Sequence, residues 1–430
     1  MKALVISYYF PPVNHIAAQR ADAFQRYFPK YGINPVIATR HWSSEDKSWE
    51  DYFAGNRSGP DIEKTDRGPV LRLPFRGSDG YARAKRLGRT AHQAYILTRT
   101  ALGDPQPEIE IFRDFFPHLK NYLERNPVDA IVSTFQPASV LRLGHELSKE
   151  AGIPYVADFR DVWNPAAFGA SESANNERQA FLNKFQERYF AKWLSNAALV
   201  SAVNQPIIDR IATFCPSAVE NSVVVTNGFE ADLFESVEAV GKEKFTFSVI
   251  GTLYAGHDLS IMLDGLNRFL ENKSEKEILL NFVGAAAIEE TTKILRERLP
   301  QRFLNLSGRI LHNEAIRELK SSHVLFYVGW KGYKGMTPGK IFDYLGARRN
   351  ILIAPSDHDT IERIVKETKA GRTADSVEDF VSILEGWYRE WKEKGAIPYI
   401  GDEEAINFYT RENQTAILAR EILGVIERKQ

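Results

Sequence analysis

The stretch GWKGYKGMTPGKIFDYLGARRNILIA, residues 329–354, places a loop, a helix and a strand in direct succession. Its loop alternates glycines with lysines, namely Gly332, Gly335 and Gly339 with Lys331, Lys334 and Lys340. Pro338 leads into a predicted helix over 338–347 with Asp343 in its first turns, and the β-branched run 350–354 predicts a strand. Glycines let a backbone approach a ligand closely, lysines bring positive charge, and a helix start adds its dipole. The segment therefore fits a diphosphate site, and a glycine-rich surface loop with solvated lysines is the simpler alternative.

The same strand–loop–helix order recurs along the whole chain. Short, nearly continuous apolar runs predict strands at 2–7, 35–39, 69–73, 129–133, 154–157, 197–202 and 222–226, and then at 245–250, 278–283, 304–307, 323–328 and 350–354. Helical spacing fills the intervals near 15–31, 137–151, 177–195, 205–214, 258–272, 287–299, 313–321, 338–347, 358–368 and 376–395. Strands of this kind are buried on both faces, so the alternation predicts an α/β fold with parallel sheets.

The strand–helix pattern runs twice, with a polar break near 235–244. We expect two Rossmann-like domains, an N-terminal one at 1–238 and a second one at 239–403. Residues 43–128 hold one clear strand, so we expect an insertion there in the first domain. In the tail, 404–430, apolar residues recur at helical spacing and predict a final helix that packs on a domain: Leu418, Ile422, Val425 and Ile426.

Composition narrows the functional classes. The 430 residues carry 55 Lys and Arg against 56 Asp and Glu, so the global basic field of a nucleic-acid-binding protein is absent. Cys215 is the single cysteine, which excludes an intramolecular disulfide and a cysteine-based zinc site, and the nine histidines show no metal-ligand spacing. The N-terminus lacks the pattern of a signal peptide and the apolar runs are too short to span a bilayer, so we expect a cytoplasmic protein.

Residues 81–103 are strongly basic. They contain five cationic side chains and no carboxylate: Arg83, Lys85, Arg86, Arg89 and Arg99. One interpretation is a solvated helix in the insertion. The other is a basic amphipathic surface for anionic lipid or a lipid-phosphate acceptor, which would bring the protein to the inner face of the membrane.

Charged residues also follow the predicted strand 154–157. Asp158, Arg160 and Asp161 stand where open α/β sheets place their ligands, at the carboxyl end of a strand. An Arg160–carboxylate pair that fastens the loop is the structural alternative. His15 and His257 lie in two further strand–helix loops and are worth testing for the same reason.

Taken together, the motifs resemble those of the GT-B glycosyltransferases of family 4. They are YYFPP (8–12), GIPYVADFRDVW (152–163), TNGFEADLF (226–234), VIGTLYAGHD (249–258), SGRI (307–310) and PGKIFDYLGARRNIL (338–352). The resemblance covers nearly the whole chain, rests on the order and spacing of the motifs, and is greatest to the bacterial polysaccharide and lipopolysaccharide branch. It implies two Rossmann-like domains facing a cleft, with a C-terminal helix that crosses back to the N-terminal domain.

The resemblance also implies an activity. The second domain would bind a UDP- or GDP-sugar and the first a glycan or lipid-linked acceptor. The transfer would be retaining, with neither a metal nor another cofactor, and would serve the synthesis of cell-surface polysaccharide. A catalytically weak partner subunit that binds nucleotide-sugar and a nucleotide-sugar epimerase are the alternatives.

Site residues carry over position by position. Asp343 matches the acidic residue that holds the ribose, where Glu is more usual. The first acidic residue of the family pair falls on Lys334 or Gly335, so donor-sugar recognition would pass to Lys334 and to the backbone of three residues, Gly335, Met336 and Thr337. This departure is what favours the partner-subunit alternative.

The remaining matches concern the phosphates, the base and the acceptor. Lys340 matches a lysine near the phosphates and would stabilise the leaving diphosphate. Gly251, Thr252 and Gly284 would face the diphosphate, and Arg309 and Ile310 would meet the base. On the acceptor side, the matches are Asn14, His15, Asp158, Arg160 and Asp161. Asp161 is the candidate base.

Overall fold

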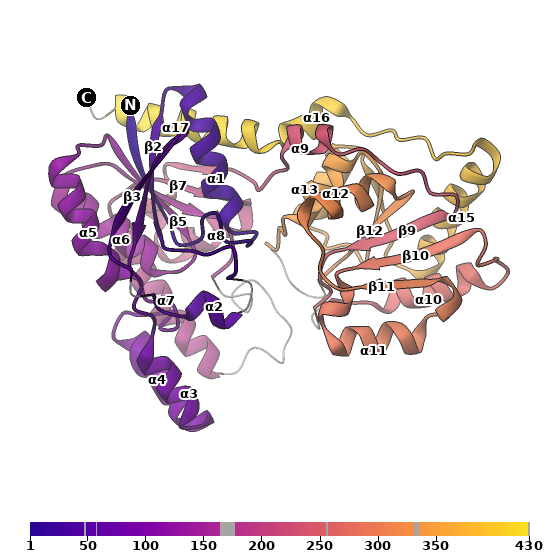
Figure 1. The fold of residues 1–430 in the computed structure, drawn as a ribbon, viewed down its shortest axis with the longest axis horizontal. Coiled ribbons are helices and arrows are strands. Elements are labelled where there is room, and N and C mark those ends of the chain that lie inside the picture. The colour runs from indigo at the N-terminus through magenta and orange to yellow at the C-terminus, as the bar shows by residue number, and fades with distance from the viewer. Residues whose placement is uncertain (47–48, 57, 164–176, 255–256, 331–334, 429–430) are drawn as a thin grey trace. The chain divides into compact units, whose positions relative to one another are not determined.

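The computed structural model describes residues 1–430 except 47–48, 57, 164–176, 255–256, 331–334 and 429–430. The chain forms two compact units (Figure 1). The first takes in the described residues up to Thr226 and those from Glu412 onward, and the second runs from Asn227 to Arg411. Each unit is built around one largely parallel sheet, as the alternating pattern predicts.

The sheet of the first unit has the strand order β3-β4-β2-β1-β5-β6-β7-β8. Its strands are β1 (Lys2–Ser7), β2 (Asn34–Arg40), β3 (Asp61–Thr65), β4 (Gly68–Leu73), β5 (Ala130–Phe135), β6 (Tyr155–Phe159), β7 (Ala197–Ala202) and β8 (Ser222–Val224). All neighbours pair in parallel except β3 and β4, which form an antiparallel hairpin at the sheet edge. The helices are α1 (Ala18–Tyr27), α2 (Trp49–Phe53), α3 (Asp79–Arg86), α4 (Arg89–Ala101), α5 (Phe112–Arg125), α6 (Ser139–Ala151), α7 (Glu177–Leu194), α8 (Gln205–Phe214) and α17 (Arg411–Glu427).

The sheet of the second unit is parallel throughout, with the order β11-β10-β9-β12-β13-β14. Its strands are β9 (Phe245–Ile250), β10 (Ile278–Val283), β11 (Leu304–Ser307), β12 (Val324–Val328), β13 (Asn350–Ala354) and β14 (Gly371–Thr373). Its helices are α9 (Ala231–Ser236), α10 (Ser260–Leu270), α11 (Glu289–Arg298), α12 (His312–Ser321), α13 (Lys340–Ala347), α14 (Thr360–Glu367), α15 (Val377–Lys394) and α16 (Glu403–Phe408).

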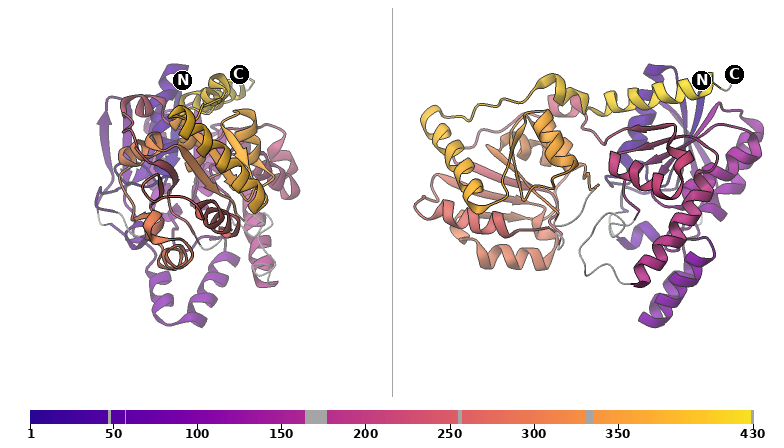
Figure 2. Two further views of the ribbon diagram at one scale, coloured as in Figure 1. Left: turned by 90° about the vertical axis from the view of Figure 1, so that its right-hand side faces the viewer. Right: turned by 180° about the vertical axis from the view of Figure 1, so that it is seen from behind.

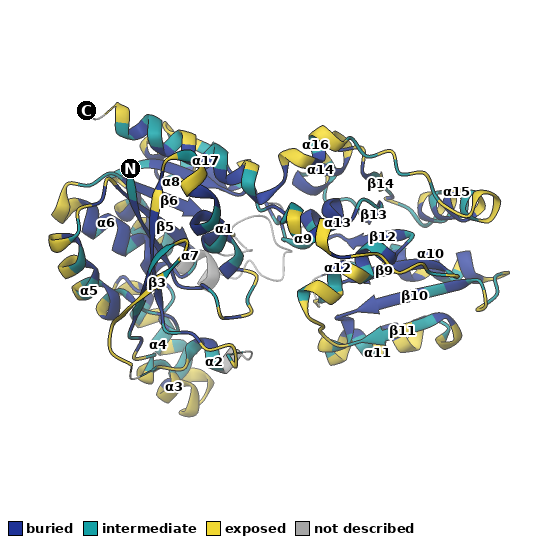
Figure 3. Ribbon diagram, turned by 45° about the horizontal axis from the view of Figure 1, so that its top comes forward, coloured by how far each residue is buried: buried dark blue, intermediate teal, exposed yellow. Residues whose placement is uncertain are grey.

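Helices cover both faces of each sheet, so the side chains of the central strands are buried almost throughout (Figure 3): β1, β5, β6, β9, β12 and β13. In β12, Phe326 packs in one apolar cluster, while its neighbours Leu325 and Tyr327 pack in another. In β1, Leu4 and Val5 divide between two clusters in the same way. This alternation follows from the two-residue period of a strand.

The final helix confirms the prediction that the C-terminus returns to the N-terminal domain. Four apolar residues of α17 pack in the same cluster as Ala3 and Val5 of β1: Leu418, Ala419, Ile422 and Val425. In Figure 2 this helix lies along the unit that contains both termini. In the described part of the chain, no helix combines the length and apolarity needed to cross a bilayer.

The unit boundaries differ from the predicted residues 238 and 404. Residues 227–238 belong to the second unit because Phe229 and Phe234 pack in its core, in the cluster that also holds Tyr344. Residues 404–411 belong there too, since Phe229 forms a β-bridge with Thr410.

The insertion predicted at 43–128 contains more regular structure than its one clear strand suggested. Besides β4, the described residues form β3 and the helices α2, α3, α4 and α5. The sequence does not predict β3, because DIEKT has no apolar alternation, and the structure shows that the side chains of this strand are almost entirely exposed.

Candidate functional site

The strand order of the second unit defines where a ligand is expected. Going outward from β9, the order runs to β10 and β11 on one side and to β12, β13 and β14 on the other. The connections therefore change direction between β9 and β12, and open parallel sheets bind ligands just beyond the carboxyl ends of strands at such a switch point. The loops that follow β9 and β12 begin at Gly251 and Gly329, so the candidate site lies there.

Gly251 and Gly284 bring the loops after β9 and β10 into close approach. Both have a positive φ, 115° and 87°, which favours glycine. A Cβ on Gly284 would lie 3.2 Å from the carbonyl carbon of Gly251. Their amides, however, donate to the carbonyls of Val283 and Ser307, at 2.8 and 3.0 Å. These glycines therefore shape the site through the close approach of their loops, and their amides are already bonded to the backbone. The prediction that the two residues face the diphosphate stays a prediction.

Lys340 is the first residue of α13 and lies beside the β9 loop. Its Nζ is 5.0 Å from the ring centroid of Tyr327, a residue of β12, and a Cβ on Gly251 would lie 3.8 Å from its Cδ. The side chain thus runs across the switch point. Burial lowers the pKa of Lys340 to about 8. Its ammonium group and the start of α13 together place positive charge where the sheet order predicts a ligand.

His257 contributes a second polar group in the β9 loop. Its ring is 8% exposed and lies 4.2 Å from the ring of Trp330, centroid to centroid, and the two residues form a β-bridge. Nδ1 lies 2.8 Å from the backbone nitrogen of Tyr254, whose N–H can donate to it, and 3.1 Å from the carbonyl oxygen of the same residue. We assign the proton of the neutral ring to Nε2 because the contact with the Tyr254 N–H is the shorter of the two. Burial, followed by the charge of Lys340, lowers the pKa of His257 to about 3. Nε2 is buried and has no hydrogen-bond partner among the described residues.

Asp343 and His312 meet at the start of α13. His312 Nε2 lies 3.2 Å from Asp343 Oδ2, and the Asp343 side chain is 17% exposed. This hydrogen bond raises the pKa of His312 above its usual value, although burial opposes the shift. Sequence reasoning singled out Asp343 and not His312. The signal available was the position of His312 two residues after Ile310, because Arg309 and Ile310 are exposed in the β11–α12 loop.

The glycine-rich loop of residues 329–339 is described in part. Lys331 and Lys334 lie outside the described residues, so the predicted role of Lys334 stays a prediction. The amide of Gly335 donates to Asp359 Oδ2 at 2.8 Å and is therefore already engaged. Sequence reasoning missed Asp359, whose carboxylate lies beside Gly335, one of the two positions onto which the first acidic residue of the family pair falls. Of the other predicted residues, Thr252 and Met336 are half-buried and Thr337 is buried.

In the first unit, Asp158 belongs to the interior. It is fully buried, and its carboxylate accepts hydrogen bonds from Arg20 at 2.6 and 2.8 Å and from the hydroxyls of Thr134 and Ser201, each at 2.6 Å. The expectation that Asp158 faces an acceptor is therefore wrong. The structural alternative was an Arg160–carboxylate pair, and the structure shows that the arginine paired with Asp158 is Arg20.

The other residues predicted on the acceptor side remain accessible. Asp161 is exposed, Arg160 is half-buried with its guanidinium 5.5 Å from the ring of Tyr9, and Asn14 is exposed. His15 stacks on Tyr9 with centroids 4.3 Å apart, and its Nδ1 accepts from the amide of Ala17 at 3.1 Å. Their predicted roles stay predictions.

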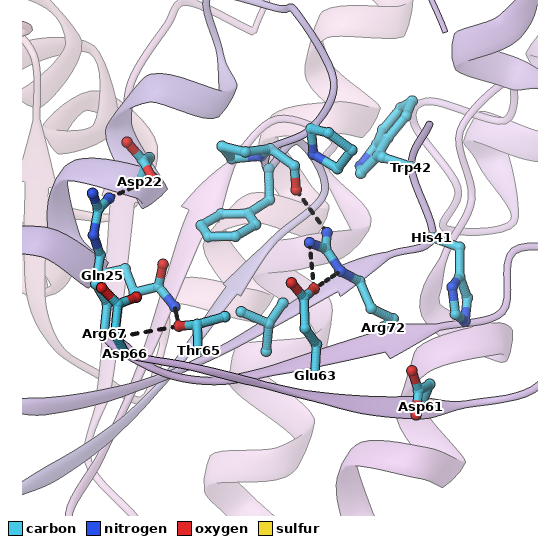
Figure 4. A pocket seen from close by; sticks show the side chains of 14 residues that line it. Asp22, Gln25, His41, Trp42, Asp61, Glu63, Thr65, Asp66, Arg67 and Arg72 are labelled. Atoms are coloured by element: carbon cyan, nitrogen blue, oxygen red, sulfur yellow. Dashed lines mark hydrogen bonds and ion pairs between the residues drawn. The ribbon is translucent and has the colours of Figure 1, made fainter. Parts of the chain in front are cut away.

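A separate hollow of about 590 Å³ lies in the first unit, between the β3–β4 hairpin, α1 and the loop after β1 (Figure 4). Its charged side chains are largely engaged with one another. Arg72 donates to Glu63 at 2.9 Å and to the carbonyl of Pro11 at 2.7 Å, and Arg67 lies 3.7 Å from Asp22. These contacts tie the hairpin to the rest of the unit, so we interpret the hollow as structural.

Among the residues that the structure describes, no group of three or more His, Cys, Asp or Glu side chains is placed to hold a metal ion. No protein-family model matches the sequence, and the search of curated proteins gives no match either.

Solved structures match over the full length of the chain. A sucrose-phosphate synthase from Thermosynechococcus elongatus has a TM-score of 0.66 at 12% identity, covering 99% of both chains. A glycosyltransferase from Rickettsia africae ESF-5 has a TM-score of 0.63 at 10% identity, covering 98% of both chains. HepE from Anabaena, solved in complex with UDP, has a TM-score of 0.55 at 11% identity, covering 100% of this chain and 98% of its own. These likenesses confirm the predicted fold, the GT-B architecture of two parallel-sheet domains.

Proposed function

We propose that this protein is a retaining glycosyltransferase, similar to family 4, that transfers a sugar from a UDP- or GDP-sugar to a glycan or lipid-linked acceptor. The observation that carries the proposal is the placement of Lys340 at the switch point of the second sheet, at the start of α13. A lysine and a helix start at that position suit a diphosphate. The UDP bound to HepE, a protein of the same fold, supports a uridine nucleotide as the first candidate.

The chemistry follows from where charge develops. As the bond between the sugar and the diphosphate breaks, negative charge accumulates on the leaving diphosphate. Lys340 stabilises that charge, and the dipole of α13 adds to its effect, because both are fixed in place before the reaction. The acceptor hydroxyl attacks from the face that the diphosphate leaves, and its proton passes to a leaving-group oxygen or to the carboxylate of Asp161. We propose no metal in this scheme.

The ribose and the sugar would meet the two carboxylates of the site. Asp343 can accept hydrogen bonds from a ribose diol, and its bond with His312 fixes its orientation. Asp359 supplies a carboxylate next to Gly335, where donor-sugar recognition is expected. The acceptor would bind the first unit, and synthesis of cell-surface polysaccharide in the cytoplasm is the process we propose.

Thermal stability tests the proposal directly. A ligand that binds only the native state raises the melting temperature by mass action, and at about 100 times its Kd it adds about 2.7 kcal/mol. We would compare UDP, GDP and ADP with their sugar conjugates, with EDTA present throughout. We expect a shift with UDP or GDP that Asp343→Ala abolishes.

Glu290→Ala is the matched control, because Glu290 is an exposed acidic residue in the first turn of α11 in the same unit. It should keep the full shift. If no nucleotide moves the melting temperature of the well-folded protein, the donor site is refuted. If nucleotides bind and no sugar is turned over with any acceptor, the catalytically weak partner subunit becomes the better description.

A further inference from the structure

The helices α3 and α4 form a hairpin that projects from the rest of the first unit (Figures 1 and 2). The turn between them consists of Leu87 and Gly88, and Gly88 has a φ of 101°, which favours glycine. At its base, the hairpin is fastened by Tyr189 of α7, whose hydroxyl donates to the carbonyl of Ala101 at 2.7 Å. The turn therefore lies at the far end of a projecting hairpin whose base is fixed to α7.

The end of this hairpin carries unbalanced positive charge. Arg83, Lys85, Arg86 and Arg89 are all exposed, and none of them forms an ion pair with any residue that the structure describes. Other arginines of this unit behave differently. Arg99, at the base of the hairpin, pairs with Asp104 at 2.7 Å, and Arg76, Arg113 and Arg210 also have carboxylate partners.

The same end presents an apolar side chain to solvent. Leu87 is 73% exposed and lies between the cations of the two helices, and α3 is exposed over most of its length (Figure 3). Unlike Leu87, the aromatic rings of the hairpin pack against one another. Tyr81 packs edge-on against His92 with centroids 4.8 Å apart and contacts Tyr95, whose hydroxyl lies 3.4 Å from Ser78 Oγ.

We propose that the end of the α3–α4 hairpin, residues 83–89, docks the protein on an anionic lipid bilayer. The cations complement anionic headgroups, and Leu87 enters the boundary between headgroups and acyl chains. A nucleic acid would share the charge requirement, but it would gain nothing from Leu87, and the rings that would stack on bases are engaged with each other. The proposal does not depend on the proposed transferase activity, since it concerns a different surface.

Sedimentation with vesicles tests the proposal on the full chain. We expect the protein to sediment with vesicles of phosphatidylcholine that contain phosphatidylglycerol, and not with phosphatidylcholine alone. Each cation near such a surface contributes on the order of a fivefold gain in partitioning. The double variant Arg86→Gln with Arg89→Gln should therefore bind roughly 25-fold more weakly. Binding should also fall steeply with salt, because the Debye length shrinks from about 10 Å at 0.1 M to about 3 Å at 1 M.

The matched control is Arg125→Gln with Lys149→Gln, which removes two exposed, helical cations elsewhere in the same unit. It should bind vesicles like the original protein. Leu87→Ser should weaken binding at high salt as well as at low salt, since the apolar contribution is not screened. Unchanged melting temperatures would show that the variants fold.

Three results would overturn the proposal. One is equal sedimentation with neutral and anionic vesicles, and another is equal binding by the two double variants. The third is an absence of vesicle binding while single-stranded RNA binds and Arg86→Gln with Arg89→Gln abolishes it, which would assign the hairpin to nucleic acid.

Discussion

Arg20 and Asp158 form a buried ion pair, with Arg20 Nη2 2.6 Å from Asp158 Oδ1 and Arg20 Nε 2.8 Å from Asp158 Oδ2. Arg20 also donates to the carbonyls of Val225 and Thr226 at 3.0 and 3.1 Å. The pair therefore joins α1, the end of β6 and the segment after β8 inside the first unit. Arg20 makes four hydrogen bonds to protein groups, and both carboxylate oxygens of Asp158 accept from protein donors, so the role of the pair is to hold the sheet and α1 together.

Removing one partner of this pair should be costly. Arg20→Met leaves a buried carboxylate without its counter-ion, for which about 3–5 kcal/mol of stability is the expected loss. Urea denaturation of the purified protein measures it. Arg67→Met is the control, because Arg67 forms an exposed pair with Asp22 at 3.7 Å and should cost less than about 1 kcal/mol. Equal losses in the two variants would contradict a special role for the buried pair.

The pair also has a pH signature. Burial raises the pKa of Asp158, but Arg20 and the hydroxyls of Ser201 and Thr134 lower it more, and the result lies below the usual value. A depressed carboxyl pKa confers stability that is present above the unfolded pKa of about 3.9 and is lost as the pH falls through the folded value. The free energy of unfolding should therefore decline below about pH 4, and less steeply in Asp158→Asn than in the original protein.

Sequence reasoning predicted the two sheets because their strands are apolar on both faces, a pattern that is local. The partner of Asp158 is not local. Arg160 is two residues away and was the natural candidate, but Arg20 is 138 residues away and reaches Asp158 only because α1 packs against the sheet. Charge pairs of this kind depend on topology, so spacing along the chain cannot reveal them.

The residues of the candidate site also fall into two groups, those that a local sequence pattern predicts and those that only the folded chain brings together. Lys340 and Asp343 could be predicted, since a glycine-rich loop before a helix start is a local signal. His312 contacts Asp343 across 31 residues, and Asp359 contacts Gly335 across 24 residues. Gly251 was predicted to face the diphosphate, but its amide donates to the carbonyl of Val283 in β10, a bond that only the assembled sheet creates.

The charge of Lys340 should make nucleotide binding pH-dependent. Burial lowers its pKa to about 8, so the ammonium form that attracts a diphosphate is lost as the pH rises through that value. Above pH 8, the affinity for UDP should then fall by up to about tenfold per pH unit. The fall ends at the pKa of Lys340 in the UDP complex, which is higher because the bound diphosphate stabilises the ammonium form. Isothermal titration from about pH 7 to about pH 9.5 measures this slope.

Lys340→Arg is the informative control, because a guanidinium stays charged throughout this range. Titration of UDP itself affects both proteins equally. The ratio of the UDP affinity of the original protein to that of Lys340→Arg should therefore change with pH only because Lys340 loses its proton. In the unliganded protein, the free energy of unfolding responds to pH in the opposite direction. A depressed lysine pKa means that the original protein gains stability as the pH rises from about 8 towards the usual value of about 10.4, and Lys340→Arg should not. Parallel pH profiles in the two proteins would contradict the assignment.

His257 offers a test that separates ligand contact from packing. Its Nδ1 accepts the Tyr254 amide, whereas its buried Nε2 has no partner among the described residues. His257→Asn can keep an acceptor near the Nδ1 position and removes the Nε2 donor. His257→Gln does the opposite, since its amide nitrogen reaches the Nε2 position and the acceptor for Tyr254 is lost.

If Nε2–H donates to the donor substrate, His257→Asn should lower the affinity for the nucleotide-sugar about tenfold or more, and His257→Gln should retain most of that affinity. Stability should follow the reverse order, with Gln losing about 1–2 kcal/mol because a buried amide is left unpaired. Calorimetric affinities and urea midpoints for the two variants give both readings. Affinity and stability falling together in each variant would show that His257 only packs against Trp330.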